Sequence, residues 1–283
     1  MEQAEKRANI LIEALPYIKE YNKKIVVVKY GGNAMVNKEL KIAVMEDIIL
    51  LHLVGIKVVL VHGGGPEISK MLAKLNIESV FSDGLRITDK ETVKVAQMVL
   101  AGTVNKDLVA LINAKGGNAL GLSGIDGHLL KVECLNDKLG YVGKITECNP
   151  QIVLDILNNG YIPVISSIGT NLKGEVFNIN ADTVAAEIAS AIKAESLILL
   201  TDTKGILSNK DDESSLIDTF YVKDIENYKN EKIIVGGMIP KVECCKYALD
   251  KGVNKTFIID GRVPHSLLIE ILTNQGIGTM CIK

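Results

Sequence analysis

The feature that most constrains the fold of this chain is a series of short, continuously apolar segments separated by longer stretches with helical spacing. A strand whose successive residues are all apolar is buried on both faces, as in a parallel sheet covered by helices. The alternation therefore predicts an α/β protein with a mainly parallel sheet. The predicted strands are Ile25–Val28, Val58–Val61, Ile162–Ile165, Leu197–Leu200 and Phe257–Ile259.

Between these strands, apolar residues recur every three or four positions, which is the spacing of a helix with one buried face. These stretches are Leu40–Val54, Ile68–Leu75, Val104–Ala114, Ile152–Leu157, Val184–Ile192 and Val242–Leu249. Residues 127–147 and 168–178 differ, because they combine Gly, Asn and Lys with short alternating segments. That pattern predicts β-hairpins.

A separate helical stripe precedes the first strand. Its apolar members are Ala4, Ala8, Leu11, Leu15 and Ile18. Pro16 lies inside this pattern and removes one backbone donor, which predicts a kink. Such a helix either packs on its own domain or pairs subunits, and packing on its own domain is the simpler interpretation of the residues alone.

Composition argues against several classes of protein. Of the 283 residues, 47% are hydrophobic and 23% charged, which suffices for one large domain or two packed lobes. The net charge of −2 argues against nucleic-acid binding, which normally requires a basic surplus. The five cysteines lack Cys-x-x-Cys spacing and the four histidines are scattered. We therefore expect reduced thiols, and neither a disulfide framework nor a metal cluster.

We expect a cytoplasmic protein without a membrane segment. Glu2, Glu5 and Glu13 interrupt any apolar core of a signal peptide. The longest apolar stretch, Ile48–Val61, is divided at Gly55 and contains charged or polar side chains. It is typical of a helix end followed by a strand, and not of a membrane span.

A glycine-rich turn directly follows the first predicted strand. Lys29 ends that strand, and a lysine at the end of a buried strand is costly unless an anion meets it. Gly31 and Gly32 would let backbone N–H groups approach that anion closely. A surface lysine before a tight turn would explain the same residues, so this turn alone only suggests an anion site.

A second glycine-rich turn follows the second predicted strand, which runs into His62. Gly63, Gly64 and Gly65 precede Pro66, a residue suited to the start of a helix, and such a helix end can bind a phosphate or carboxylate. Neither turn matches the Walker pattern or the dinucleotide pattern. Two such turns in one sheet indicate that two anionic groups meet there. We interpret His62 as a structural hydrogen-bonding residue rather than a base.

Polar residues precede two further predicted helices. Arg86 lies just before a helix that Asp89 could cap, and arginine suits a two-pronged grip on a carboxylate. An exposed loop arginine is the simpler interpretation of Arg86 taken alone. Asn180 suits an N-cap and Asp182 suits the first turn of the following helix. That structural account does not cover Asn178, which lies outside the helix.

Lys241 indicates an anion site more strongly than Lys29 does. It follows Gly236, Gly237 and Pro240, which predict a glycine loop that enters a helix near Pro240. A cation in the first helical turn is unfavourable by about 0.3–1 kcal/mol, so a lysine there suggests a phosphate at the same helix end. Phosphoryl transfer needs mainly positioning and positive charge. Two lysines, glycine amides and one aspartate would be adequate for it.

Five segments of the chain resemble, in this order, the N-acetylglutamate kinases of the amino-acid kinase family. The segments are Val28–Gly32, His62–Pro66, Gly84–Thr88, Asn178–Asp182 and Gly237–Lys241. The resemblance covers the chain from about residue 8 to its end. It implies an open three-layer α/β/α sandwich with a mainly parallel sheet. It also implies an N-terminal helix in residues 1–22, a lobe for N-acetyl-L-glutamate in residues 23–178 and a lobe for MgATP in residues 179–283.

The resemblance also implies roles for individual residues. Lys29 and Lys241 would neutralise charge on the transferring phosphoryl group, and Asp182 would orient both lysines. The residues implied for the acetylated amino acid are Gly64, Gly65, Arg86 and Asn178, with Arg86 on the α-carboxylate. The residues implied for ATP are Gly32, Thr201, Asp202, Gly205 and Met238, with the Gly32 and Gly64 amides on phosphoryl oxygens and Mg²⁺ held by the nucleotide.

Two segments resemble the arginine-sensitive members of this family. They are residues 13–18, around the kink, and residues 276–280, near the C-terminus. In such members the kinked helix interlaces dimers into a hexamer, a trimer of dimers. The resemblance implies an arginine pocket with Tyr17, His265, Glu270 and Gly278.

Three alternatives stay open at this point. The first is another amino-acid kinase, acting on glutamate, aspartate, carbamate or a nucleoside monophosphate such as UMP. The second is a dinucleotide-dependent oxidoreductase, which should contain Gly-x-Gly-x-x-Gly in a strand–helix unit. The third is a non-catalytic amino-acid sensor, against which the presence of Lys29, Asp182 and Lys241 argues.

Overall fold

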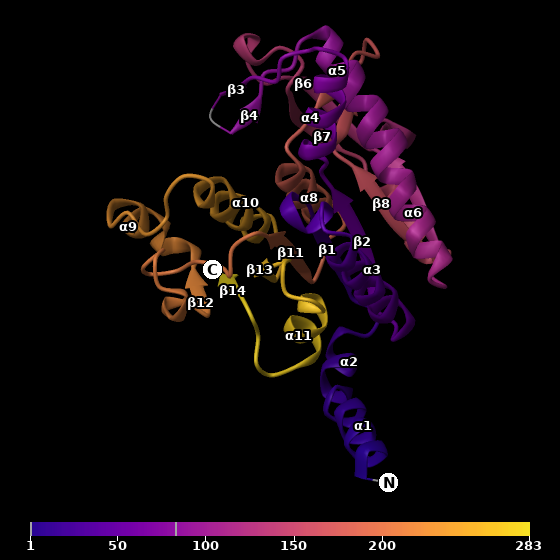
Figure 1. Cartoon of the computed structure of the whole chain (residues 1–283), viewed down its shortest axis with the longest axis vertical. Helices are drawn as coiled ribbons and strands as arrows, with labels where there is room; N and C mark the ends of the chain where they lie inside the picture. The colour runs from indigo at the N-terminus through magenta and orange to yellow at the C-terminus, as the bar shows by residue number, and fades with distance from the viewer. Residues whose placement is uncertain (1, 83) are drawn as a thin grey trace.

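The computed structural model describes residues 2–82 and 84–283, and it confirms the predicted α/β class (Figure 1). An eight-stranded sheet in the order β12-β14-β13-β11-β1-β2-β8-β5 forms its centre. All neighbouring strands in it are parallel except β13 and β14. The strands are β1 (Ile25–Tyr30), β2 (Lys57–His62), β5 (Ala119–Ser123), β8 (Ile162–Ser166), β11 (Ser196–Thr201), β12 (Thr219–Tyr221), β13 (Lys255–Asp260) and β14 (Thr279–Ile282).

The five predicted strands are confirmed as β1, β2, β8, β11 and β13, and the sequence pattern missed β5, β12 and β14. The confirmed strands are buried along nearly their whole length, because helices cover both of their faces. The missed strands lie toward the two ends of the sheet, where buried and exposed residues mix. Short strands with mixed exposure lack the continuous apolar signal.

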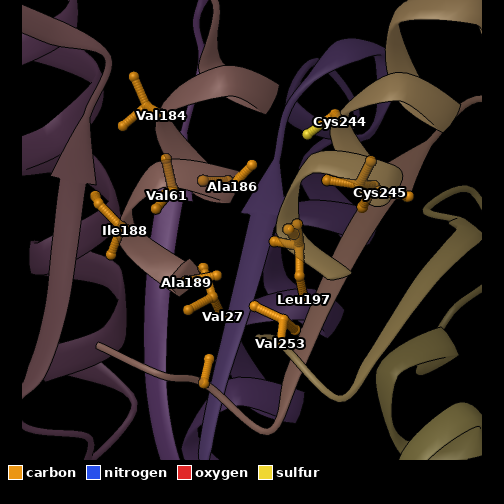
Figure 2. Close-up of a cluster of buried hydrophobic side chains, with 14 of the residues drawn as sticks. Val27, Val61, Val184, Ala186, Ile188, Ala189, Leu197, Cys244, Cys245 and Val253 are labelled. Atoms are coloured by element: carbon orange, nitrogen blue, oxygen red, sulfur yellow. The ribbon is translucent and has the colours of Figure 1, made fainter. Parts of the chain in front are cut away.

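Successive side chains of the central strands point to opposite faces of the sheet and pack in two separate hydrophobic cores. Val27 of β1 packs with residues of α7 (Gln151–Asn158), α8 (Ala181–Ala191) and α10 (Met238–Asp250), and Figure 2 shows it near Ala189 and Leu197. Val26 and Val28 belong to the opposite core, with residues of α3 (Lys38–Leu53), α4 (Gly65–Lys74), α6 (Asn105–Ala114) and α11 (Ser266–Leu272). Helices on both faces thus explain why the central strands are apolar at every position.

The predicted helical stretches are all confirmed, with small differences at their ends. They correspond to α3 (Lys38–Leu53), α4 (Gly65–Lys74), α6 (Asn105–Ala114), α7 (Gln151–Asn158), α8 (Ala181–Ala191) and α10 (Met238–Asp250). The others are α1 (Glu2–Glu13), α2 (Leu15–Tyr21), α5 (Lys90–Gln97), α9 (Ile225–Asn230) and α11 (Ser266–Leu272). The first turns of α4 and α10 extend one residue before Pro66 and two before Pro240. Proline is tolerated there because the first N–H groups of a helix have no intrahelical partner.

Two predicted helix caps are confirmed. The Asn180 side chain accepts hydrogen bonds from the backbone N–H groups of Asp182 and Thr183 at 2.8 and 3.2 Å. The Asp89 carboxylate accepts one from the Thr92 N–H at 2.7 Å. Each cap satisfies backbone donors that the first helical turn cannot pair internally.

The predicted hairpins are confirmed, and together they form a second sheet beside the main one. Its four strands run in the order β10-β9-β6-β7. β6 pairs with β7 and β9 with β10, both antiparallel. The strands are β6 (Leu130–Cys134), β7 (Gly143–Cys148), β9 (Ile168–Thr170) and β10 (Val176–Asn178), and a further small hairpin joins β3 (Phe81–Ser82) to β4 (Leu85–Arg86).

Helices α5 and α6 are joined by the π-helical segment Met98–Val104 into one continuous helix, Lys90–Ala114. By length and composition alone this helix could cross a membrane. Its apolar residues Leu100, Leu108 and Ile112, however, are buried in the core. It therefore has the features of a core helix.

The N-terminal stripe forms two helices, and the predicted kink is confirmed. The break between α1 and α2 falls at Ala14, and Pro16 is the second residue of α2. Figure 1 shows α1 extending away from the body of the molecule. Ile10 and Leu11 on α1 are 63% and 73% exposed.

The two halves of the chain occupy the two halves of the main sheet. Residues 23–178 contribute β1, β2, β8 and β5, whereas residues 179–283 contribute β11, β13, β14 and β12. The boundary lies between β1 and β11, which are hydrogen-bonded neighbours. The division into a substrate lobe and a nucleotide lobe stays a prediction about what each half binds.

The side chain of Asn105 on α6 forms hydrogen bonds to β5 and β8 of the main sheet. Its substitution tests how much this contact contributes to stability. The side-chain Nδ2 of Asn105 lies 3.2 and 2.9 Å from the carbonyl oxygens of Leu122 and Val164 and 3.1 Å from Nε2 of His62, and its two hydrogens are shared among these acceptors. We expect Asn105→Ala to lower the free energy of unfolding by about 2–4 kcal/mol, because buried polar groups lose their partners. Urea denaturation followed by circular dichroism measures it. The exposed control Asn227→Ala should change it by less than about 0.5 kcal/mol, and equal effects would contradict the prediction.

Candidate active site

The two glycine-rich turns meet at the carboxyl edge of the main sheet. β1 and β2 are parallel neighbours with Tyr30 opposite His62, so the turns that follow them lie side by side. They line a cavity of about 300 Å³. Ligands of open α/β sheets bind at this edge. The predicted site residues in its wall are Lys29, Gly32, Gly64, Gly65, Arg86, Asn178 and Asp182.

Asp182 joins two lysines that come from opposite halves of the chain. Its Oδ1 lies 2.9 Å from the Lys29 ammonium, and its Oδ2 lies 3.2 Å from the Lys241 ammonium. The side chains of Lys29 and Asp182 are largely buried. One carboxylate thus holds two cations that would otherwise repel each other.

The charge of this cluster is net positive. Burial alone would raise the pKa of Asp182, but the adjacent Lys29 and Lys241 ammonium groups overcome burial and lower the pKa to about 2. The carboxylate is therefore ionised at neutral pH. The cluster pairs two lysines with one ionised aspartate, so one positive charge is left over for an anion.

A second cavity, of about 320 Å³, adjoins the first through this cluster. It is lined by Lys241 and, among others, by Asp202, Gly205 and Met238. Lys241 belongs to the second cavity and Asp182 to the first, and 3.2 Å separates their side chains. A group passing from one cavity to the other would therefore pass the two lysines.

Two glycines of the turns are required by geometry. Gly32 has φ of +68°, in the left-handed region that favours glycine. A Cβ on Gly64 would lie 2.6 Å from Leu100 Cδ2 and 3.3 Å from Val104 Cγ2. The π-helical segment therefore packs directly on the second glycine turn, which leaves no space for a side chain there.

Arg86 is a buried cation that contacts only neutral groups in the part of the chain that the structure describes. Its guanidinium donates hydrogen bonds to the Gly65 carbonyl at 3.0 Å, to Ser69 Oγ at 2.8 Å and to Ser79 Oγ. It also lies 4.6 Å from the centre of the Phe81 ring. Burial lowers the pKa of Arg86. A buried arginine that faces a cavity and has no carboxylate partner among the described residues is suited to bind a carboxylate of a ligand.

Thr201 and His62 form hydrogen bonds within the protein. Thr201 ends β11 and lines neither cavity, and its hydroxyl bonds with the Thr203 carbonyl at 2.9 Å. His62 is fully buried, donates from Nδ1 to the Gly63 carbonyl at 2.8 Å and accepts the Asn105 amide at Nε2. Burial lowers the pKa of His62 to about 4, so it is neutral at pH 7. These contacts agree with its interpretation as a hydrogen-bonding residue.

A third cavity, of about 350 Å³, lies beside α2 and α11. Three of the residues predicted for arginine line it: Tyr17, Glu270 and Gly278. His265 is not part of this lining. It is the N-cap residue of α11, and its Nδ1 lies 2.6 Å from Oδ1 of the buried Asp47 on α3.

Sequence reasoning missed several residues that line the first cavity or hold Arg86 in its wall. Ser69 and Ser79 hold Arg86, and Phe81, Leu100 and Ser167 line the wall. Ser69 lies four residues after Gly65 on α4, so helical periodicity could have placed it near the turn. The others approach the site only through tertiary packing and carry no local signal.

The chain belongs to the amino acid kinase family, whose model matches residues 24–260. A relative named acetylglutamate kinase from Desulforamulus reducens is 52% identical over 281 residues, 98% of this chain and 98% of that protein. One of the same name from Clostridium kluyveri is 54% identical over 275 residues, 96% of this chain and 97% of that protein.

Solved structures share this fold. N-acetylglutamate synthase from Neisseria gonorrhoeae, complexed with coenzyme A and N-acetyl-glutamate, matches with a TM-score of 0.86 and 26% identity. The match covers 98% of this chain but 63% of the synthase chain. Carbamate kinase from Giardia lamblia, bound to AMP-PNP, matches with a TM-score of 0.67 and 18% identity over 92% of this chain and 98% of that chain. At that identity, the second match shows the fold alone.

The depressed pKa of Asp182 predicts a specific acid sensitivity. An aspartate has a pKa of about 3.9 in an unfolded chain, against about 2 here. The ion pairs therefore stabilise the fold above about pH 4, and this contribution is lost as the pH falls toward 2. We expect the unfolding free energy of the wild type relative to Asp182→Asn to fall by about 2 kcal/mol between pH 4 and pH 2.

Chemical denaturation at a series of pH values measures this difference. The exposed Asp250 on α10 provides a control, and Asp250→Asn should follow the wild-type profile. Parallel profiles for the wild type and Asp182→Asn would refute the linkage.

Proposed function

We propose that this chain is an acetylglutamate kinase, which transfers the γ-phosphate of ATP to the side-chain carboxylate of N-acetyl-L-glutamate in arginine biosynthesis. The names of relatives that match nearly its full length support this function. The observation that carries it is the Lys29–Asp182–Lys241 cluster at the junction of two cavities. The five free cysteines suit the cytoplasm, where we place the enzyme.

The first cavity would hold the acceptor. Arg86 would bind the α-carboxylate, since its buried charge has only neutral contacts among the described residues. Gly65 and Asn178 would hold the rest of the acetylated amino acid. The side-chain carboxylate would then point toward Lys29 and the glycine turns, which line the same cavity.

Lys29 and Lys241 would stabilise the charge that spreads over the phosphoryl oxygens in the transition state. They flank one carboxylate, so their ammonium groups are held in place before the substrates bind. Asp182 would orient them without itself exchanging a proton, since it is ionised at neutral pH. Backbone N–H groups of Gly32 and Gly64 would contact the same oxygens.

The second cavity would hold the nucleotide. Asp202, Gly205 and Met238 line it, and its wall also includes apolar side chains suited to a base. Magnesium would enter as part of MgATP and neutralise the phosphates. The carboxylate at the junction already contacts two lysines, which fits an ion held by the nucleotide rather than by Asp182. Thr201, at the end of β11, would act through the loop that follows it.

The acceptor assay tests the function directly. We expect the purified protein to phosphorylate N-acetyl-L-glutamate with a kcat/KM at least about a hundredfold above that for glutamate, aspartate, carbamate or UMP. Coupled measurement of ADP release supplies these values. Preference for another acceptor would overturn the assignment of the substrate while leaving phosphoryl transfer intact.

Lys241→Ala provides the matched test of the cluster in the same assay. Loss of one cation at the transferring group should lower kcat by about 100-fold or more. Lys246→Ala changes an exposed lysine of the same helix and should leave kcat within about twofold of the wild type. Full turnover by Lys241→Ala would refute its role.

We infer that the enzyme also forms a hexamer, as a trimer of dimers, and is inhibited by arginine. The protruding helix α1 with exposed Ile10 and Leu11 supports pairing between subunits. The third cavity supports a guanidinium ligand, because Glu20, Asp218 and Glu270 line it beside Tyr17. Gly278 would let the ligand approach the backbone, and His265 would act from the start of α11, on which Glu270 also lies.

Two substitutions test this regulation. Leu11→Glu should convert hexamers to dimers in sedimentation, because a charge replaces an exposed apolar contact. Glu270→Gln should abolish inhibition by millimolar arginine, because the guanidinium loses a carboxylate. The controls are Leu172→Glu, at an 85% exposed leucine elsewhere, and Glu226→Gln, at an exposed glutamate. Wild-type dimers at working concentration would contradict the hexamer, and wild-type turnover unaffected by arginine would contradict the inhibition.

A further inference from the structure

The guanidinium of Arg86 donates hydrogen bonds to two serine hydroxyls that lie outside the lining of the first cavity. Nη2 donates to Ser69 Oγ at 2.8 Å and to the Gly65 carbonyl at 3.0 Å, and Nη1 donates to Ser79 Oγ. Neither serine lines the cavity, whereas Arg86 does. The serines therefore lie behind the arginine with respect to the ligand.

These hydrogen bonds use only some of the N–H donors of Arg86. A guanidinium carries five N–H donors, and three of them are committed to these acceptors. Among the described residues the remaining two have no acceptor, so they and the positive charge can serve a ligand. Hydroxyl and carbonyl oxygens accept these hydrogen bonds but leave the positive charge in place. A carboxylate in the same position would neutralise it.

The two serines also connect separate parts of the chain. Ser69 lies on α4, one turn after Gly65, and Ser79 lies in the loop that leads to β3. Phe81 of β3 pairs with Arg86 of β4, and its ring packs on the guanidinium. The arginine is thereby fixed relative to the second glycine turn, next to the cavity that takes the acceptor.

We propose that Ser79 and Ser69 are positioning residues that set the orientation of Arg86 toward the α-carboxylate of the acceptor and thereby determine its affinity. This inference rests on the proposed function, in which Arg86 binds that carboxylate. The serines act through the arginine alone. Their removal should weaken acceptor binding without changing the phosphoryl-transfer cluster, which lies on other elements.

A double-mutant cycle separates this role from a general contribution to folding. Ser79→Ala should raise the KM for N-acetyl-L-glutamate about five- to twentyfold, the effect of losing a hydrogen bond to a charged group. Ser69→Ala should act in the same direction, with kcat and the KM for ATP within about twofold of the wild type. In an Arg86→Ala background, neither serine substitution should raise the acceptor KM further.

Two further variants make the result specific. Ser79→Thr keeps the hydroxyl and should retain an acceptor KM near that of the wild type. Ser190→Ala removes a hydroxyl that bonds to the Ala186 carbonyl on α8, away from Arg86, and should leave the acceptor KM unchanged. Thermal unfolding of every variant reports on the fold, and the Ser69 cycle carries the test if Ser79→Ala does not fold.

The outcomes distinguish this inference from the proposed function. An unchanged acceptor KM in both serine variants, or an equal increase with and without Arg86, would overturn the positioning role. A wild type that uses a different acceptor would overturn the proposed substrate instead. The cycle is then measured with that acceptor, and the same non-additivity is expected if Arg86 binds its carboxylate.

Discussion

The buried carboxylate of Asp182 between two ammonium groups is the interaction on which the rest of this structure depends. Lys29 comes from β1, Asp182 from the first turn of α8 and Lys241 from the first turns of α10. Each charge would be costly to bury alone, and together they are stable only when all three elements are in register. The geometry of the candidate active site and the joining of the two halves of the sheet thus depend on the same contact.

Around this cluster the candidate site keeps positive charge that the carboxylates among the described residues do not fully neutralise. The cluster keeps one positive charge, and the contacts described for Arg86 are to hydroxyls, a carbonyl and an aromatic ring. Glycine turns add backbone N–H groups without side chains that would block the approach. In the proposed function, an acceptor carboxylate and a nucleotide phosphate would both meet positive charge where the cavities join, as phosphoryl transfer between them requires.

Much of the fold could be predicted because buried strands and amphipathic helices leave a periodic trace in the sequence. β1, β2 and β11 were apparent from continuous apolar residues, whereas β12 and β14 were not, because their residues alternate between the core and the surface. Site residues were predictable where their position was locally unfavourable, as for Lys29 at the end of a buried strand and Lys241 in the first turn of a helix. Ser79 violates nothing locally, and its contact with Arg86 depends on how a loop packs.

By itself, the sequence determined the class of fold, the caps at Asn180 and Asp89, and the kink near Pro16, because these depend on residues a few positions apart. The tertiary structure alone decided that Asp182 bridges Lys29 and Lys241, that Arg86 has neutral partners in the described chain, and that His265 contacts Asp47. Such pairings join residues distant in the chain. Their energies depend on burial and distance, which only the packed elements set.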